Sequence, residues 1–309
     1  MQKSGVMLCG HGSRDPEAIA EFEALAAGLR ALLPATDVAT GYLEFARPLI
    51  RDGLDLLVAR GARRILAVPG MLFAASHVKN DLPWEINSFA AAHAGLDLRF
   101  GRELAIEPKL LAAARDRIEA AEAAAARTVP RGETLLLVVG RGTNDPDANS
   151  NIAKLARMLG EGMGFGWAEA AFSGVAAPLV EDALRRLVRL GFRRIIVFPY
   201  FLFTGILVKR IYGAALRVAA DHPEIEFLRA PYLNDHALVL QCFVERAREV
   251  EDGEPAMNCR LCKYRAQIIG YEADRGAPQA AHHHHVRGIG VGAPAHHHHQ
   301  HNHDHHHDE

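Results

Sequence analysis

The stretch Val6-Met-Leu-Cys-Gly-His-Gly-Ser-Arg-Asp-Pro16 returns 130 residues later as Leu136-Leu-Val-Val-Gly-Arg-Gly-Thr-Asn-Asp-Pro146. The same shift, without a gap, aligns further identical pairs and triplets along the chain. These are Pro48-Leu49 with Pro178-Leu179, Arg63-Arg64-Ile65 with Arg193-Arg194-Ile195, and Val78-Lys79 with Val208-Lys209. So many identities in one register indicate two copies of one fold, with a period too long for a solenoid.

Within each copy, short apolar runs alternate with longer segments of helical period. In the first copy we expect strands near 5–9, 38–44, 64–69 and 96–100, with helices near 16–33, 48–60, 80–93 and 107–127. In the second we expect strands near 134–139, 168–173, 194–199 and 225–230, with helices near 146–159, 178–190, 205–221 and 234–250. The strand runs lack polar alternation, as strands buried on both faces do. The pattern predicts the α/β class: two tandem flavodoxin-like domains, each a parallel sheet with helices on both faces.

The division that we predict is a first domain over residues 1–128, a second over 129–250 and a tail over 251–309. An Ala-rich helix ends in Arg127-Thr-Val-Pro-Arg-Gly132 at the first boundary. The composition changes again at Glu251-Asp-Gly-Glu-Pro255, beyond which periodic apolar patterning stops. We expect the tail to be disordered because it lacks the apolar content of a packed core.

Charge and composition narrow the class of protein. The 309 residues include 35 Lys and Arg against 37 Asp and Glu, a net charge of -2, which argues against a general nucleic-acid binder. Apolar runs are far shorter than the roughly 20 residues of a membrane span or the core of a signal peptide. Four cysteines are too few for a disulfide scaffold. We therefore expect a soluble cytoplasmic protein whose anionic partners meet a local basic patch.

Three polar residues of the first copy follow expected strands. His11 lies in the turn after the first strand, Glu44 closes the second, and His77 lies in the loop after the third. In open α/β sheets, ligands bind outside the carboxyl ends of the strands. If these strands are neighbours, two imidazoles and a carboxylate meet in one crevice, a set that suits Co²⁺, Ni²⁺, Fe²⁺ or Zn²⁺. The alternative is structural: a His in a Gly-rich turn or a Glu after a strand is often a cap.

The repeat provides an internal control for this alternative. At the 130-residue shift, His11, Glu44 and His77 correspond to Arg141, Gly174 and Leu207. All three candidate ligands are missing from the second copy, whereas its framework glycines and prolines remain. Scaffold roles would have persisted in both copies, so we interpret the three residues as functional in the first.

Three motifs carry a family resemblance: Leu8-Cys-Gly-His-Gly-Ser-Arg-Asp15, Gly41-Tyr-Leu-Glu44 and Val68-Pro-Gly-Met-Leu-Phe-Ala-Ala-Ser-His77. Over about residues 5 to 275 the chain resembles the class II chelatase family, which inserts a metal into sirohydrochlorin. Within the family it is most similar to the long-form cobaltochelatases of cobalamin biosynthesis, a part of porphyrin-type biosynthesis. The resemblance implies a lyase with two chelatase-like domains, the first catalytic and the second degenerate.

The resemblance also implies roles for the candidate residues. His11 and His77 would bind the metal and take part in proton transfer, with Glu44 beside them. Neutral imidazole suits both tasks because it binds metals and accepts protons near pH 7. The mechanism needs no ATP, and the sequence contains no G-x-x-x-x-G-K-[ST] loop. The partners would be sirohydrochlorin and a divalent metal, with Co²⁺ as the substrate metal.

Sirohydrochlorin is rimmed by carboxylates, so its site needs a basic lining. Candidates near the strand ends are Arg14, Arg47, Lys79, Arg141, Lys209 and Arg210. Each of them alone could equally be an ordinary surface cation. Arg141 stands where the first copy has His11, in a turn that we expect to face the same crevice between the two copies.

The tail contains Met257-Asn-Cys-Arg-Leu-Cys262, which resembles the M-x-C-x-x-C motif associated with iron-sulfur binding in long-form members of the family. Cys259 and Cys262 supply two of the four thiolates of a [4Fe-4S] cluster, which two chains could share in a homodimer. A redox dithiol or half a zinc site stays possible. Thirteen of the 18 histidines lie between His282 and His307 in an interrupted run, which we interpret as a metal-binding tail rather than a purification tag.

Two alternative functions stay open at this point. Within the class, the same residues could insert Fe²⁺, as a sirohydrochlorin ferrochelatase of siroheme synthesis does, or Ni²⁺, because the donors do not select among these metals. From another class, the chain could be a metal storage or delivery protein that acts through its His-rich tail.

Overall fold

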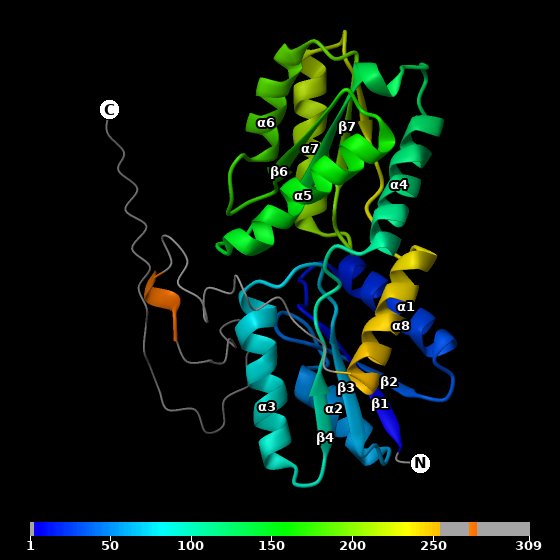
Figure 1. The fold of residues 1–309 in the computed structure, drawn as a ribbon, viewed down its shortest axis with the longest axis vertical. Coiled ribbons are helices and arrows are strands. Elements are labelled where there is room, and N and C mark those ends of the chain that lie inside the picture. Colours follow the sequence, from blue (N-terminus) through cyan, green and yellow to red (C-terminus); the bar gives the residue numbers. More distant parts are fainter. Residues whose placement is uncertain (1–2, 254–271, 277–309) are drawn as a thin grey trace.

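The computed structural model describes residues 3–253 and 272–276, which form two lobes of similar construction (Figure 1). The strands of the first lobe are β1 (Ser4–Gly10), β2 (Asp37–Tyr42), β3 (Arg64–Pro69) and β4 (Asp97–Phe100). Those of the second are β5 (Thr134–Gly140), β6 (Trp167–Phe172), β7 (Arg194–Pro199) and β8 (Glu226–Arg229). Each set forms a parallel sheet, in the orders β2-β1-β3-β4 and β6-β5-β7-β8. The predicted class and the two tandem parallel-sheet domains are confirmed.

The helices between the strands follow the same repeat. The first copy has α1 (Pro16–Leu32), α2 (Ile50–Ala59), α3 (Leu82–Ala92) and α4 (Pro108–Ala123), and the second has α5 (Pro146–Met163), α6 (Val180–Leu187), α7 (Ile206–Asp221) and α8 (Ala237–Asp252). One-turn helices lie at Arg131–Glu133, Val188–Leu190 and Glu272–Asp274. α1 and α5 start alike because Asp15 and Asp145 accept hydrogen bonds from backbone N–H groups of the first turn, and a proline follows each aspartate.

The apolar core has three parts, which lie between the faces of the sheets and the helices that cover them. α2 and α3 cover one face of the first sheet, and α6 and α7 cover one face of the second. The opposite faces of both sheets belong to one continuous apolar cluster that runs from Leu8 and Phe22 of the first lobe to Leu155 and Phe198 of the second. The two lobes therefore share a core.

The last helix of each repeat packs on the other lobe. α4 contacts α5 and β8, whereas α8 returns to contact α1 and β3 (Figure 1). An arginine at the equivalent position of each helix binds the lobe on which that helix packs. Arg246 of α8 donates hydrogen bonds to the carbonyl oxygens of Glu103 and Leu104, at 3.0 and 2.8 Å. Arg117 of α4 donates one to the carbonyl oxygen of Leu233, at 2.8 Å. Each lobe in space therefore takes one helix from the other repeat.

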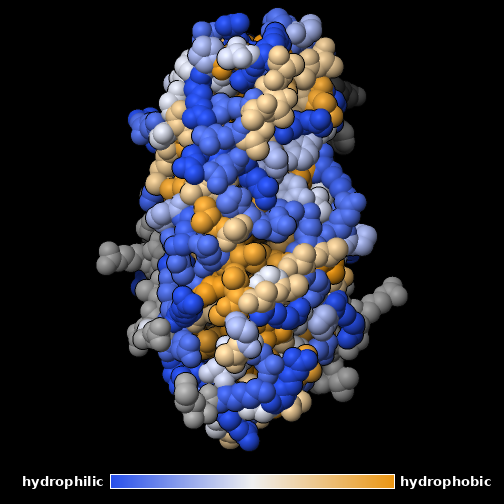
Figure 2. Space-filling view, turned by 90° about the vertical axis from the view of Figure 1, so that its right-hand side faces the viewer, coloured by the Kyte–Doolittle hydropathy of each residue, from blue (hydrophilic) through white to orange (hydrophobic). Residues whose placement is uncertain are grey.

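Figure 2 shows the outcome of this exchange. The two lobes form one continuous body on the side where α1, α4 and α8 lie, with hydrophilic side chains over most of it and an apolar area over the lower lobe. Within the described part of the chain, every helix is too short or too polar to cross a bilayer.

The two copies differ in length by one residue. Lys79 and Lys209 are equivalent at an offset of 130, whereas β4 and β8 pair with β3 and β7 so that Asp97 corresponds to Glu226, an offset of 129. The first copy accommodates its extra residue in a π-helical turn, His77–Asp81, in which the backbone N–H of Leu82 donates to the carbonyl of His77. The helix predicted near 80–93 is therefore the π turn followed by α3, while α7 has no such turn.

Candidate metal centre

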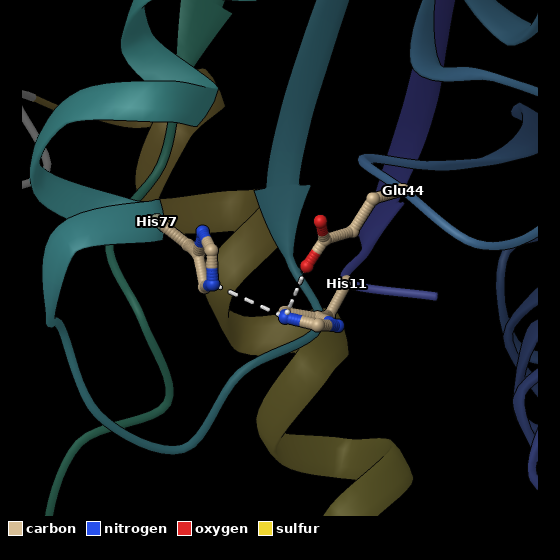
Figure 3. Close-up of side chains that lie close together, drawn as sticks. All are labelled: His11, Glu44 and His77. Atoms are coloured by element: carbon tan, nitrogen blue, oxygen red, sulfur yellow. Dashed lines mark hydrogen bonds and ion pairs between the residues drawn. The ribbon is translucent and has the colours of Figure 1, made fainter. Parts of the chain in front are cut away.

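His11, Glu44 and His77 meet at the carboxyl edge of the first sheet. They follow β1, β2 and β3, which the strand order β2-β1-β3 places side by side. One ligand atom of each lies within 4.8 Å of the others, and Figure 3 shows the three side chains directed toward one another. The sequence pattern predicted this meeting on the condition that the strands be neighbours, and the sheet meets that condition.

The distances within the group are short. His11 Nε2 lies 3.1 Å from Glu44 Oε1 and 3.1 Å from His77 Nε2. The Glu44 side chain is 4% exposed, while those of His11 and His77 are 30% and 22% exposed. A buried carboxylate therefore backs two imidazoles that can still be reached from solvent.

The other nitrogen of each imidazole settles its tautomer. His11 Nδ1 lies 2.9 Å from the Gly12 carbonyl oxygen, and His77 Nδ1 lies 2.6 Å from Asp81 Oδ2. A carbonyl or carboxylate oxygen only accepts, so in the neutral ring each Nδ1 carries the hydrogen and each Nε2 has its lone pair toward the group. The two Nε2 atoms are 3.1 Å apart, and a proton or a metal cation between them satisfies both lone pairs. The arrangement is therefore suited to a positive ion.

Gly12 allows the close approach of the first two ligands. Its φ is +97°, and a Cβ at this position would lie 1.7 Å from the carbonyl oxygen of Glu44. The backbone N–H of Glu44 donates to the His11 carbonyl at 3.0 Å, which sets the turn after β1 against the end of β2. Only glycine combines this backbone conformation with this contact.

Comparison with known proteins places the chain in a family. The sequence model of the CbiX family matches residues 5–121 and 135–250, one match for each repeat. The chain belongs to the CbiX family. A curated relative, the sirohydrochlorin cobaltochelatase of Priestia megaterium, is 35% identical over 264 residues, which are 85% of each chain. The sirohydrochlorin ferrochelatase of Bacillus subtilis strain 168 is 27% identical over 80% of this chain and 92% of its own.

Solved structures show the same relationship for this CbiX chain. The sirohydrochlorin chelatase SirB from Bacillus subtilis subspecies spizizenii, in complex with cobalt, has a TM-score of 0.68 and 26% identity, covering 81% of this chain and 97% of that one. SirB from Bacillus subtilis with Fe³⁺ has a TM-score of 0.72 and 26% identity, covering 81% and 96%. The chelatase fold expected from the motifs is confirmed.

The basic residues expected around the CbiX site fall into two groups. Arg14, Arg47 and Arg141 are exposed, and Arg14 stacks over the Phe45 ring at 5.0 Å, beside His11. Arg141 of the second lobe is close enough to the Glu44 carboxylate to be influenced by it: surrounding protein lowers the pKa of the guanidinium, and Glu44 opposes this shift. Arg141 of the second lobe therefore lies within electrostatic range of Glu44.

Lys79 and Lys209 instead join the lobes by equivalent ion pairs. Lys79 Nζ lies 2.8 Å from Asp145 and 3.1 Å from Asp147, while Lys209 Nζ lies 2.9 Å from Asp15 and 2.8 Å from Glu17. The Lys79 side chain is 1% exposed, which does not fit the expectation that it contacts substrate, and Lys209 already has two carboxylate partners. Hydrogen bonds raise the pKa of both ammonium groups although desolvation opposes them, strongly at Lys79.

Two features of the site were not anticipated from the sequence. These are the hydrogen bond from His77 to Asp81 and the π turn that contains both residues. The i, i+4 spacing of a His and an Asp after a strand was the available signal, but it is common in ordinary helices. Cys259, Cys262 and the tail histidines lie outside the described residues.

Proposed function

We propose that the chain inserts a divalent metal into sirohydrochlorin without ATP, and that its metal in cobalamin biosynthesis is Co²⁺. One observation carries the proposal: two imidazole Nε2 atoms and a buried carboxylate converge at the open carboxyl edge of the first sheet, and among residues 3–253 and 272–276 no such group lies at the second. The family and the names of its relatives supply the substrate class.

The geometry supports a simple sequence of steps. His11 and His77 donate Nε2 lone pairs to the incoming metal in place of water, and Glu44 offsets its charge. Insertion then releases two pyrrole N–H protons for each M²⁺ that enters the ring, so charge balances. As each imidazole gives up the metal, its Nε2 becomes free to accept one of these protons. The first lobe thus supplies both the donors and the bases.

Arg14, Arg47 and Arg141 are the residues that we propose to bind the substrate's carboxylates. Within the described part of the chain Arg47 pairs with Asp52 at 3.8 Å, and its side chain is 62% exposed, so it is available to a ligand. Arg141 approaches from the second lobe, which gives the degenerate repeat a role in holding the macrocycle over the metal donors.

Cobalt is the finer part of the proposal. The relative at 35% identity bears the name of a cobaltochelatase, whereas a relative at 27% is named a ferrochelatase. The donor set itself accepts Co²⁺, Fe²⁺ and Ni²⁺. The [4Fe-4S] cluster at Cys259 and Cys262, the homodimer and the cytoplasmic location stay predictions, the first of which iron and sulfide analysis of anaerobically purified protein would test.

The deciding experiment is an optical assay of sirohydrochlorin with Co²⁺, Fe²⁺ and Ni²⁺ in turn. We expect insertion with Co²⁺ at the highest kcat/KM, and loss of insertion in His11→Ala and His77→Ala. His93→Ala is the matched control, since His93 stacks on Phe89 in the same lobe without joining the metal centre. Absence of insertion with all three metals would refute the proposal, and a preference for Fe²⁺ would refute its cobalt part.

A further inference from the structure

His77 is held through its second nitrogen by a buried carboxylate. The distance from His77 Nδ1 to Asp81 Oδ2 is 2.6 Å, and the Asp81 side chain is 5% exposed. The other oxygen of Asp81 accepts a hydrogen bond from Asn80 Nδ2 at 2.7 Å. Asp81 is thus oriented by its own neighbour and lies on the far side of the imidazole from His11.

The backbone around this pair is specific to the first repeat. His77 and Asp81 are the first and last residues of the π turn, which takes up the one residue that the second repeat lacks. The corresponding stretch of the second repeat contains Leu207, Arg210 and Ile211, within a regular helix. The second repeat therefore lacks equivalents of His77, of Asp81 and of the π turn that joins them. π turns of this kind are frequent at functional sites.

The π turn is also anchored on its outer side. Val78, next to His77, is fully buried in the core under α3, and Lys79 is tied to Asp145 and Asp147 of the second lobe. These contacts hold the backbone of the turn. The hydrogen bond from Nδ1 to Asp81 acts on the ring itself, on the side opposite the contact of Nε2 with His11.

We propose that Asp81 is a positioning residue that sets the tautomer and orientation of His77, so that the Nε2 lone pair faces the metal. The inference rests on the proposed metal site. A carboxylate that accepts from Nδ1 keeps the hydrogen on that nitrogen and makes Nε2 the stronger donor. Without it, the ring can turn over or exchange tautomers, either of which removes the lone pair from the position facing His11.

The test is the affinity of the full-length protein for Co²⁺ alone, followed by visible absorption. Because we expect the tail histidines to bind Co²⁺ as well, the titration of His77→Ala, whose tail is identical, is subtracted from each variant. Asp81→Leu keeps the branching at Cγ and removes the acceptor, and we expect its site-specific affinity to fall roughly 10- to 100-fold. Asp97→Asn is the control, since Asp97 is a partly buried carboxylate with two arginine partners in the same lobe, outside the metal centre.

A second readout separates positioning from general stability. In ¹⁵N spectra of histidine-labelled metal-free protein, the signals that His77→Ala removes report the His77 tautomer. We expect the hydrogen on Nδ1 in the unsubstituted protein and a mixture of tautomers in Asp81→Leu. If Asp81→Leu fails to fold, Asp81→Asn decides, because it keeps the shape and removes the charge, and we expect about tenfold weaker binding.

Unchanged Co²⁺ affinity and an unchanged tautomer in a folded Asp81 variant would overturn the positioning role of Asp81. The proposed function would still stand if the unsubstituted protein inserts the metal. Conversely, site-specific Co²⁺ binding that depends on Asp81, without insertion into sirohydrochlorin, would refute the proposed function and leave the positioning role intact. The two failures are therefore distinguishable.

Discussion

His11, Glu44 and His77 distinguish the first repeat from the second on backbones that are otherwise alike. Gly12 and Gly142 both have positive φ, of +97° and +82°, and a Cβ on either would fall within 2 Å of the carbonyl oxygen of residue 44 or 174. The turn geometry has persisted in the copy that lacks the donors. The proposed metal donors are thus side chains that only one of two equivalent scaffolds carries.

Gly12→Ala is expected to destroy the metal centre while leaving the fold. The added Cβ forces apart the backbones of His11 and Glu44, and a displacement of about 1 Å costs on the order of 100-fold in rate. Gly61→Ala is the control: its φ is +88° but its Cβ would meet nothing within 4 Å, so it should cost only about 1–2 kcal/mol of stability. Insertion rates and thermal melts of both variants test this; equal insertion rates would contradict it.

Glu103 provides a pH-dependent prediction. This carboxyl is buried, and desolvation raises its pKa despite the nearby cations Arg102 and Lys79. The folded state therefore holds its proton to higher pH than the unfolded state does, so this group lowers stability as pH rises through the unfolded pKa, about 4.3. Glu103→Gln should raise the Tm at pH 7 to 8, with the difference disappearing below pH 4. Calorimetry across this range measures it, and a lower Tm at pH 7 would count against it.

At the scale of elements, two equivalent ion pairs between the lobes differ in how far their side chains are buried. Lys79 and Asp145 are 1% and 0% exposed, whereas Lys209 and Asp15 are 54% and 17% exposed. Both pairs join the start of one repeat's third helical segment to the first turn of the other repeat's first helix. The same chemistry therefore occurs in two dielectric environments within one chain.

Lys79→Ala should destabilise the protein by about 3–5 kcal/mol, because Asp145 stays buried without its counter-ion. Lys209→Ala should have a much smaller effect, since water and salt screen an exposed pair. Urea unfolding of the two variants compares them directly, and each serves as the control for the other. Similar losses in both would show that burial does not decide the difference.

At the scale of the whole molecule, the exchange of α4 and α8 makes the two lobes one structure. The apolar cluster that runs through both lobes cannot be divided without exposing its side chains to water. Arg141 of the second lobe also lies within electrostatic range of Glu44 in the first. A single repeat would lack both the helix that the other repeat contributes to its lobe and the guanidinium of Arg141.

Removal of residues 282–309 distinguishes a chelatase from a metal-delivery protein. If the metal centre performs insertion, the shortened chain should keep nearly full activity at ample Co²⁺ and lose activity only when Co²⁺ is scarce, because we expect the tail imidazoles to raise the local metal concentration. Insertion rates over a range of Co²⁺ concentrations measure this. Loss of activity at saturating Co²⁺, with His11→Ala still active, would favour the delivery function.

The sequence by itself determined the elements and their order. Buried strands appear as unbroken apolar runs, and helices appear as apolar residues with a 3.6-residue period. Both patterns lie within a short stretch of the chain, so the sequence of that stretch is enough to predict the element. The shift of 130 residues then established two copies, and the loss of His11, Glu44 and His77 from the second singled out these three residues as candidate metal ligands. The motifs around these residues pointed to the family that the comparisons confirmed.

Only the tertiary structure decided which elements meet. The order β2-β1-β3 brings the three donors together, α4 and α8 change lobes, Lys79 is buried against Asp145, and Asp81 lies beneath His77. Periodicity shows that a face is buried but not what covers it, because the partner lies far away along the chain. A charged side chain such as Lys79 looks the same in sequence whether it binds a substrate or joins two lobes, and its surroundings alone set that difference.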